Sequence, residues 1–98
     1  MLGGMKARSA AEAKALTDLP SIGKAMAGDF RLLGIEHPRQ LVGRDPYRLY
    51  DELCRATGAR HDPCVIDAFI SAVRFMEGAP PRPWWHYTEE RKRRLSAG

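Results

Sequence analysis

The stretch Leu19-Pro20-Ser21-Ile22-Gly23-Lys24-Ala25-Met26-Ala27 has a spacing that predicts a tight turn between two helices. Pro20 cannot continue a helix that precedes it. Ile22 is an apolar residue in a polar turn, so we expect its side chain to pack between the two helices. Gly23 has no Cβ, and its backbone can therefore approach another molecule closely or take a positive φ. Ala27 is small enough for the close contact that a tight hairpin of helices needs.

Helices are predicted on both sides of this turn. A helix from about Gly23 to Leu33 would end at Gly34, which can take the left-handed conformation of a helix stop. The preceding helix would begin at Ser9-Ala10-Ala11-Glu12, which has the pattern of a capping box, and would end near Asp18.

The rest of the chain carries further helix signals. Asp45-Pro46 and Asp62-Pro63 each place an N-cap aspartate before a proline at the first helical position. Gly58 and Gly78 are natural C-terminal stops for these two helices. The additional predicted helices are 38–42 beginning at Pro38, 45–58, 62–78, and a final basic helix with Thr88 as its N-cap.

No alternating strand pattern competes with these signals, so we expect an all-α fold, a compact bundle of five to six helices. The segment 65–76 is apolar over much of its circumference, which predicts that it is the central helix. We divide the chain into a flexible N-terminus at 1–8, a helical domain at 9–78, and a Pro/Trp-containing basic extension at 79–98 that packs on the domain.

Composition limits the classes of function. Ninety-eight residues with 44% apolar content suit one small domain and leave little room for a deep catalytic cleft. No apolar run is long enough to span a membrane, and the first residues lack the apolar stretch of a secretory signal. We expect a cytoplasmic protein without a membrane partner, in which Cys54 and Cys64 are reduced thiols. The net charge is +4, and residues 79–98 hold most of the excess, with five basic and two acidic residues.

The turn also predicts an anion site. The amides at and after Gly23 begin the next helix, so they lack partners within it and have the positive end of the helix dipole behind them. Lys24 adds a mobile charge beside these amides, and Arg31 can extend it. The candidate phosphate-binding residues are Ser21, Ile22, Gly23, Lys24 and Arg31.

Residues 16–35 resemble the helix-hairpin-helix motif of DNA repair and recombination proteins, whose hairpin usually reads Leu-Pro-Gly-Ile-Gly-x-x-x-Ala with a Leu-Gly-Ile finish. Gly23, Lys24, Ala27 and Gly34 stand at the expected spacing, and Ser21 replaces the first glycine. The resemblance implies a loop backbone that contacts phosphate, within a SAM-like or tandem helix-hairpin-helix fold.

From Leu19 to Trp85 the chain is similar to the bacterial pathogenicity-locus family, also called mitomycin-resistance proteins, and to the C-terminal domain of TfoX competence regulators. The pathogenicity-locus family tends to end in a segment that Pro83-Trp84-Trp85 matches. This architecture implies that Leu41-Val42-Gly43-Arg44-Asp45 is a second, degenerate hairpin that pairs with the first. The family label names no biochemical activity.

Further basic residues would add salt-sensitive affinity for a polyanion. In the second hairpin Arg44 invites a phosphate, whereas Asp45 would repel it. The basic run near the C-terminus fits a phosphate backbone and fits a solvated terminal helix equally well. The secondary candidates are Arg44, Arg91, Lys92, Arg93 and Arg94.

The aromatic segment Trp84-Trp85-His86-Tyr87 has two interpretations. Its rings can stack on unpaired nucleic-acid bases. Alternatively, the segment folds back and the tryptophans close an exposed edge of the core, because tryptophan is rarely left in water. We expect the second arrangement.

We find no set of residues for catalysis or metal binding. Cys54, His61 and Cys64 lie close in sequence but lack the paired spacing of a zinc site, and Cys54 lies beside Leu53, where cysteine acts as a small apolar residue. There is no serine–histidine–acid arrangement and no P-loop. We therefore expect no enzyme, no metal, no cofactor and no small-molecule substrate.

The sequence thus predicts a non-enzymatic helix-hairpin-helix module that binds DNA through its phosphates, without strong sequence preference, in repair, recombination or competence. A protein-interaction adaptor on the same fold, with residues 84–87 as its contact, is the alternative.

Overall fold

The computed structural model describes residues 6–97, and no strand occurs in that range, so the all-α prediction is confirmed. Residues 1–5, which make up most of the expected flexible N-terminus, lie outside the described residues, as does residue 98. In place of five to six helices, this range has four α-helices and four 3-10 turns. They are η1 (Ala10–Glu12), η2 (Leu16–Asp18), α1 (Lys24–Leu32), η3 (Pro38–Leu41), α2 (Pro46–Thr57), α3 (Cys64–Met76), η4 (Trp84–Tyr87) and α4 (Thr88–Ala97).

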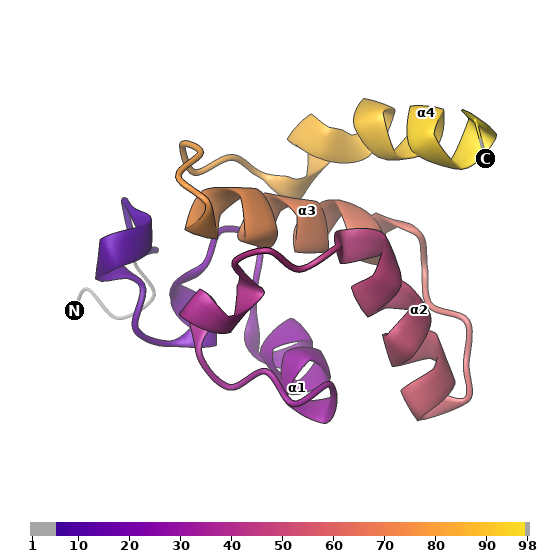
Figure 1. The fold of residues 1–98 in the computed structure, drawn as a ribbon, viewed down its shortest axis with the longest axis horizontal. Helices are drawn as coiled ribbons and strands as arrows, with labels where there is room; N and C mark the ends of the chain where they lie inside the picture. The colour runs from indigo at the N-terminus through magenta and orange to yellow at the C-terminus, as the bar shows by residue number, and fades with distance from the viewer. Residues whose placement is uncertain (1–5, 98) are drawn as a thin grey trace.

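Helix α3 is the centre of the fold, as its apolar composition predicts. From Ile66 to Met76 every residue except Arg74 is buried. Figure 1 shows α1 and α2 on one side of α3 and α4 on the other. Phe30 of α1 stacks on Phe69 of α3, with ring centroids 4.8 Å apart. Because α3 is packed from both sides, it needs apolar residues around most of its circumference. No helix among residues 6–97 is long and apolar enough to cross a membrane.

The prediction of a single helix between Ser9 and Asp18 is wrong, because two separate 3-10 turns, η1 and η2, occupy that stretch. The predicted capping box does not form. Ser9 makes no side-chain cap bond, and Glu12 accepts from an amide one residue earlier than the box requires. Asp18 Oδ2 accepts from the amides of Lys14 and Ala15, each at 2.9 Å. Such local side-chain bonds offer the backbone an alternative to a continuous helix.

The last residues of the expected flexible N-terminus are attached to the first turn. Lys6 donates from Nζ to the carbonyl oxygens of Thr17 and Ile22, each at 2.7 Å. The Ala7 amide donates to the carbonyl of Asp18 at 2.9 Å. Lys6 and Ala7 therefore contact η2 and the loop that follows it.

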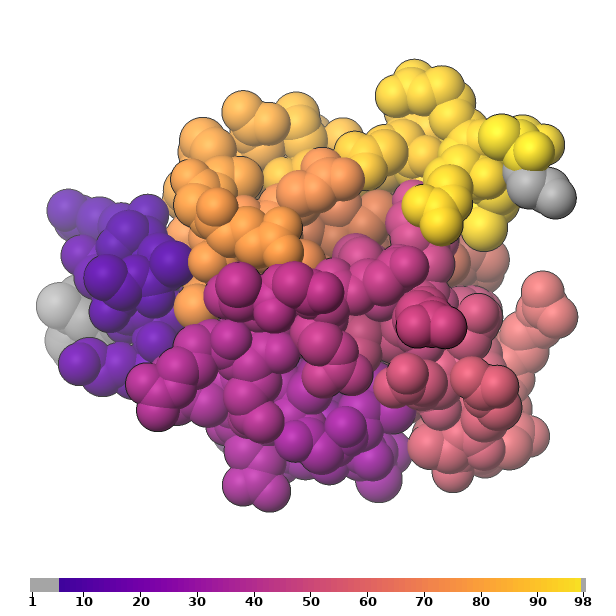
Figure 2. Space-filling view, in the orientation of Figure 1, coloured from indigo at the N-terminus to yellow at the C-terminus, as the bar shows by residue number. Residues whose placement is uncertain are grey.

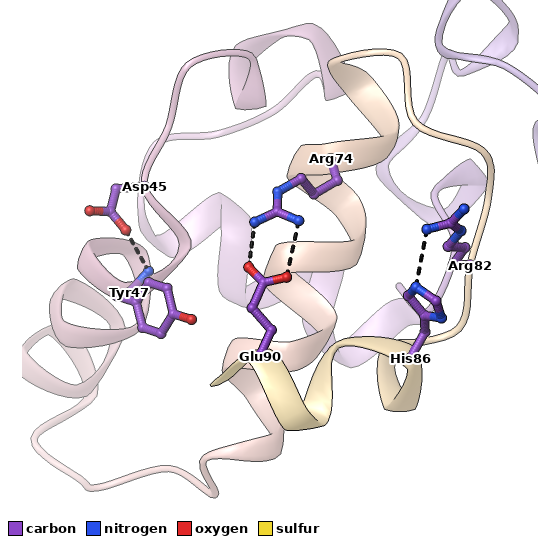
Figure 3. A network of polar contacts seen from close by, with 6 residues as sticks. All are labelled: Asp45, Tyr47, Arg74, Arg82, His86 and Glu90. Carbon is purple, nitrogen blue, oxygen red and sulfur yellow. Dashed lines mark hydrogen bonds and ion pairs between the residues drawn. The ribbon is translucent and has the colours of Figure 1, made fainter. Parts of the chain in front are cut away.

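The predicted N-cap of α2 is confirmed, whereas the N-cap of α3 is Pro63, and Asp62 precedes it and still accepts an amide of the first turn. Asp45 Oδ1 accepts from the Tyr47 amide at 2.9 Å (Figure 3), and Asp62 Oδ1 accepts from the Cys64 amide at 2.8 Å. Helix α3 begins one residue later than expected, after Pro63 rather than at it. The predicted glycine stops Gly34, Gly58 and Gly78 have φ angles of +81°, +67° and +108°.

The prediction that Thr88 caps the last helix is wrong, because η4 continues directly into α4. The Thr88 hydroxyl instead donates to Asp67 Oδ2 at 2.8 Å. Arg91 Nε donates to Asp67 Oδ1 at 2.9 Å. Asp67 is fully buried in α3, and a buried carboxylate is tolerated when it is paired and hydrogen-bonded. This pair attaches α4 to α3.

The expectation that the tryptophans close the core is also wrong. Tyr87 does so, with 4% of its surface exposed, whereas Trp84 and Trp85 are 40% and 64% exposed. The guanidinium of Arg74 on α3 lies 5.6 Å from the centre of the Tyr87 ring, which adds a cation–π contact to the burial of this residue. In the space-filling view the C-terminal extension forms one edge of the molecule (Figure 2).

Candidate nucleic-acid interface

The loop of residues 19–23, hereafter the first loop, has two buried anchors. Leu19 and Ile22 are both fully buried, as the apolar position in the turn predicts. Between them Ser21 has a φ of +69°. This is the left-handed region that glycine adopts most readily, and it occurs at the position where the helix-hairpin-helix pattern has its first glycine. Ser21 therefore takes a conformation that costs a non-glycine residue local strain.

The first loop ends in a row of free backbone donors. Gly23 is the N-cap of α1 and is exposed. Within residues 6–97 the amides of Gly23, Lys24, Ala25 and Met26 have no hydrogen-bond partner. Unpaired amides at a helix N-terminus face the positive end of the dipole and attract anions. The Lys24 side chain is exposed at the same helix end.

Lys6 is a residue of this region that the sequence interpretation missed. Its ammonium lies against the first loop through the carbonyl of Ile22, and partial burial lowers the pKa of Lys6 from its usual value. It adds a positive charge at the carbonyl of Ile22, directly before Gly23 in the chain. No sequence signal pointed to it, because sixteen residues separate Lys6 from its partner Ile22.

Arg31 is not gathered with the free amides. It lies in the last turn of α1, seven residues after Lys24, which corresponds to roughly 10 Å along the helix axis. Its guanidinium is therefore close to the opposite, negative end of the helix dipole. The structure thus leaves Ser21, Ile22, Gly23 and Lys24 together and separates Arg31 from them.

The segment of residues 41–45, hereafter the second loop, also has a residue at positive φ three positions before an α-helix, but the chain's own carboxylates accept from two of the nearby amides. Gly43 has a φ of +81°. Its amide donates to Glu77 Oε2 at 2.8 Å. Asp45 takes the Tyr47 amide, and the expected basic residue Arg44 pairs with Glu52 at 3.7 Å. The chain's own carboxylates therefore accept from the amides of Gly43 and Tyr47, where the corresponding part of the first loop has no such acceptor among the described residues.

The basic run of α4 divides into anchored and free residues. Arg91 is held by the buried Asp67. The Arg94 guanidinium lies 4.4 Å from the centre of the Tyr47 ring on α2. Lys92 and Arg93 are exposed. Because α4 and α1 lie on opposite sides of α3 (Figure 1), the basic run and α1 do not form one continuous surface.

Polar contacts also fix the extension to α3. Figure 3 shows the paired bonds between the Arg74 guanidinium and the Glu90 carboxylate, and the contact between Arg82 Nη1 and His86 Nε2 at 3.1 Å. The pairing with Glu90 raises the pKa of Arg74. These contacts neutralise one acidic residue of α4 and leave Arg82 beside the tryptophans.

The two cysteines are free thiols. A hydrogen bond to Asp62 raises the pKa of the Cys64 thiol, which lowers its thiolate fraction at neutral pH. Among residues 6–97 no three histidine, cysteine or carboxylate side chains gather in a way that could hold a metal ion.

Comparison with known proteins gives the family. A protein of Streptomyces lavendulae named "Mitomycin resistance protein McrB" is 49% identical over 81 residues, which are 83% of this chain and 77% of the relative. No solved structure matches the chain. The family model described as "Pathogenicity locus" matches residues 9–93, a span that includes both loops, α3 and the exposed tryptophans. This chain belongs to the pathogenicity-locus family.

Proposed function

We propose that this protein is a non-enzymatic helix-hairpin-helix module, related to the C-terminal domain of TfoX, that binds DNA through its phosphate backbone. The observation that carries the proposal is the row of unpaired amides from Gly23 to Met26, exposed beside Lys24 at the start of α1. A phosphate is the anion of DNA that such a helix N-terminus accommodates. In this proposal η2, the first loop and α1 form the hairpin.

The geometry of the first loop suits a close approach by a phosphate. A Cβ placed on Gly23 would meet no atom within 4 Å, so open space lies in front of the backbone there. Leu19 and Ile22 hold the loop to the core, which keeps the amides oriented before a ligand arrives. Phosphate contacts carry no sequence information. The module therefore binds DNA without strong sequence preference.

The remaining candidates have lesser roles in this proposal. Arg44 and Arg91 are paired within the chain, so they contribute little free charge. Lys92 and Arg93 form a separate exposed patch on α4 that raises the association rate through long-range attraction. Binding is expected to weaken as salt increases, because each neutralised phosphate releases counterions.

The setting that we propose for this activity in the cell follows from the relative of Streptomyces lavendulae, whose name refers to mitomycin resistance. We propose that the module acts in DNA repair or recombination, or in competence, within the cytoplasm. Loss of the gene is expected to lower survival on mitomycin. Unchanged survival would contradict the proposed role in repair or recombination. DNA binding itself is tested by the titration described next.

The test is a fluorescence-anisotropy titration of labelled duplex, single-stranded and branched DNA at low and moderate salt. Lys24→Glu is expected to weaken duplex binding about tenfold, since a charged hydrogen-bonding partner of the phosphate is lost. Arg60→Glu is the matched control, because it changes the net charge equally at an exposed residue after α2. The proposal fails if the protein binds none of these DNAs, or if both variants weaken binding equally.

The alternative is an adaptor that binds another protein through the same fold. The exposure of Trp84 and Trp85 favours a contact of some kind at that segment. An adaptor would retain its partner in a pull-down after nuclease treatment and at high salt. A DNA-binding module would not.

A further inference from the structure

The exposed tryptophans are a second surface feature that favours binding of a ligand. Trp84 and Trp85 are 40% and 64% exposed, although the next aromatic residue, Tyr87, is buried. Two adjacent indole rings in water leave a large apolar area without a partner. The family match extends over this segment.

The segment that presents these rings is attached to the core at both ends. Ser71 Oγ of α3 donates to the carbonyl oxygen of Arg82 at 2.6 Å, just before the tryptophans. Buried Tyr87 fixes the chain just after them. Pro83 restricts the backbone φ directly before Trp84. Because both ends are held, the rings lose little conformational freedom when a ligand binds, which reduces the entropic cost of binding.

The surroundings of the rings favour an anionic ligand. Residues 78–88 include Arg82 and His86 and no carboxylate. The carboxylates on either side are engaged within the chain, because Glu77 accepts from Gly43 and Glu90 pairs with Arg74. Glu89 is the nearby acidic residue that keeps its charge exposed.

We infer that Trp84 and Trp85 stack on the unpaired bases of single-stranded DNA, with Arg82 contacting the adjoining phosphate. Aromatic rings interleaved with basic side chains are the arrangement that binds single strands, since every base has a face that stacks. The bases of a duplex are stacked on each other and are not available to the rings. The inference rests on the proposed DNA binding and specifies the form of the DNA, a single strand or the unpaired part of a gap or branch.

The test uses the intrinsic fluorescence of the full chain, whose only two tryptophans are Trp84 and Trp85. An unstructured oligothymidine is expected to quench this emission at concentrations where a duplex of equal length does not. Trp85→Ala should weaken binding of the labelled oligothymidine about tenfold. Trp85→Phe keeps an aromatic face and should retain most of the affinity. Circular dichroism checks that the helices persist in both variants, as expected for an exposed ring.

The outcomes separate this inference from the proposed function. If the oligothymidine gives no quenching while duplex binding still depends on Lys24, the stacking inference fails and the proposed function stands. Equal quenching by duplex and single strand also overturns it. A protein partner that Trp85→Ala alone releases, together with no quenching by DNA, would assign the tryptophans to a protein interface instead. If Lys24→Glu leaves duplex binding intact while quenching persists, the phosphate site fails and the stacking site stands.

Discussion

The two loops of this protein each contain a residue with positive φ, and they differ in whether carboxylates of the chain accept from their amides. The first loop has Ser21 at φ +69° and the second has Gly43 at φ +81°, each a few residues before an α-helix. In the second loop the Glu77 and Asp45 carboxylates take up amides. In the first loop the amides from Gly23 to Met26 remain without partners in the described chain.

In the second loop, carboxylates of the chain accept from amides that could otherwise bind a phosphate. Both groups are anions with oxygen acceptors, and both are stabilised by amides at a helix N-terminus. A loop that carries its own carboxylate is satisfied in isolation and repels an external phosphate. A loop with free amides and a nearby lysine gains by binding one.

Gly23→Asp would place a carboxylate at the N-cap of α1, as Asp45 does at the N-cap of α2. The substitution is sterically open, because no atom lies within 4 Å of the new Cβ and the residue is extended at φ −94°. Aspartate is a preferred N-cap, so α1 should be at least as stable as before. Anisotropy should show that duplex affinity falls about tenfold or more, since a charged contact to phosphate is lost, while calorimetry shows an unchanged or higher Tm.

The control for this variant is Gly23→Ala, which adds a Cβ and no acceptor. Its duplex affinity should stay near that of the parent chain. An equal loss with alanine would show that bulk, and not occupation of the amides, abolishes binding.

Asp45→Ala would remove the N-cap side chain of α2, which accepts from the Tyr47 amide. Loss of an N-cap aspartate is expected to lower the free energy of unfolding by about 1 kcal/mol, measured by urea denaturation. Asp45→Asn should restore most of that loss because it keeps an acceptor for the Tyr47 amide. Duplex affinity should not decrease in either variant; a decrease would mean that the second loop, too, contacts DNA.

Ser21→Gly would remove the strain of the first loop. A left-handed conformation costs a non-glycine residue about 1–2 kcal/mol, and the extra freedom of glycine in the unfolded chain cancels roughly half of the gain. We expect the free energy of unfolding to rise by about 0.5 kcal/mol. The opposite substitution in the second loop, Gly43→Ala, should lower it. Equal effects of the same sign would mean that the two loops do not share a backbone conformation in solution.

The smallest effect concerns acid pH at the entrance of the first loop. The amides of Ala15 and Lys14 lower the pKa of Asp18. Its stabilising contribution is therefore complete above the unfolded pKa of about 3.9 and is lost as the pH falls through the lower folded value. Asp18→Asn should flatten the dependence of Tm on pH in this acidic range and leave neutral pH nearly unaffected. An unaltered slope would assign the acid sensitivity to other carboxylates.

Local signals in the sequence predicted much of the fold. The cap at Asp45, the glycine stops and the central apolar helix are all present. The failures were also local in origin. Thr88 had the right residue type for a cap but donates to Asp67 of α3. The supposed capping box at Ser9 was replaced by bonds to other amides.

The candidate site was predicted in part. Ser21 to Lys24 lie together at the start of α1, whereas Arg31, Arg44 and Arg91 are separated from the free amides or paired within the chain. The buried Asp67 could have been suspected, because it is the sole acidic residue in an apolar helix. Lys6 could not, since nothing in its neighbourhood in sequence marks it.

Local signals in the sequence set the start of α2 and the glycine stops after α1, α2 and α3, because caps, glycines and prolines act within about four residues. Which amides stay free at the helix starts depends on the tertiary structure. Glu77 reaches Gly43 from 34 positions away, and Asp67 holds Arg91 from 24 positions away. A donor such as the Gly43 amide is occupied because the packing of α3 brings a distant carboxylate to it. A local sequence pattern does not show which distant residues will be close in the folded chain.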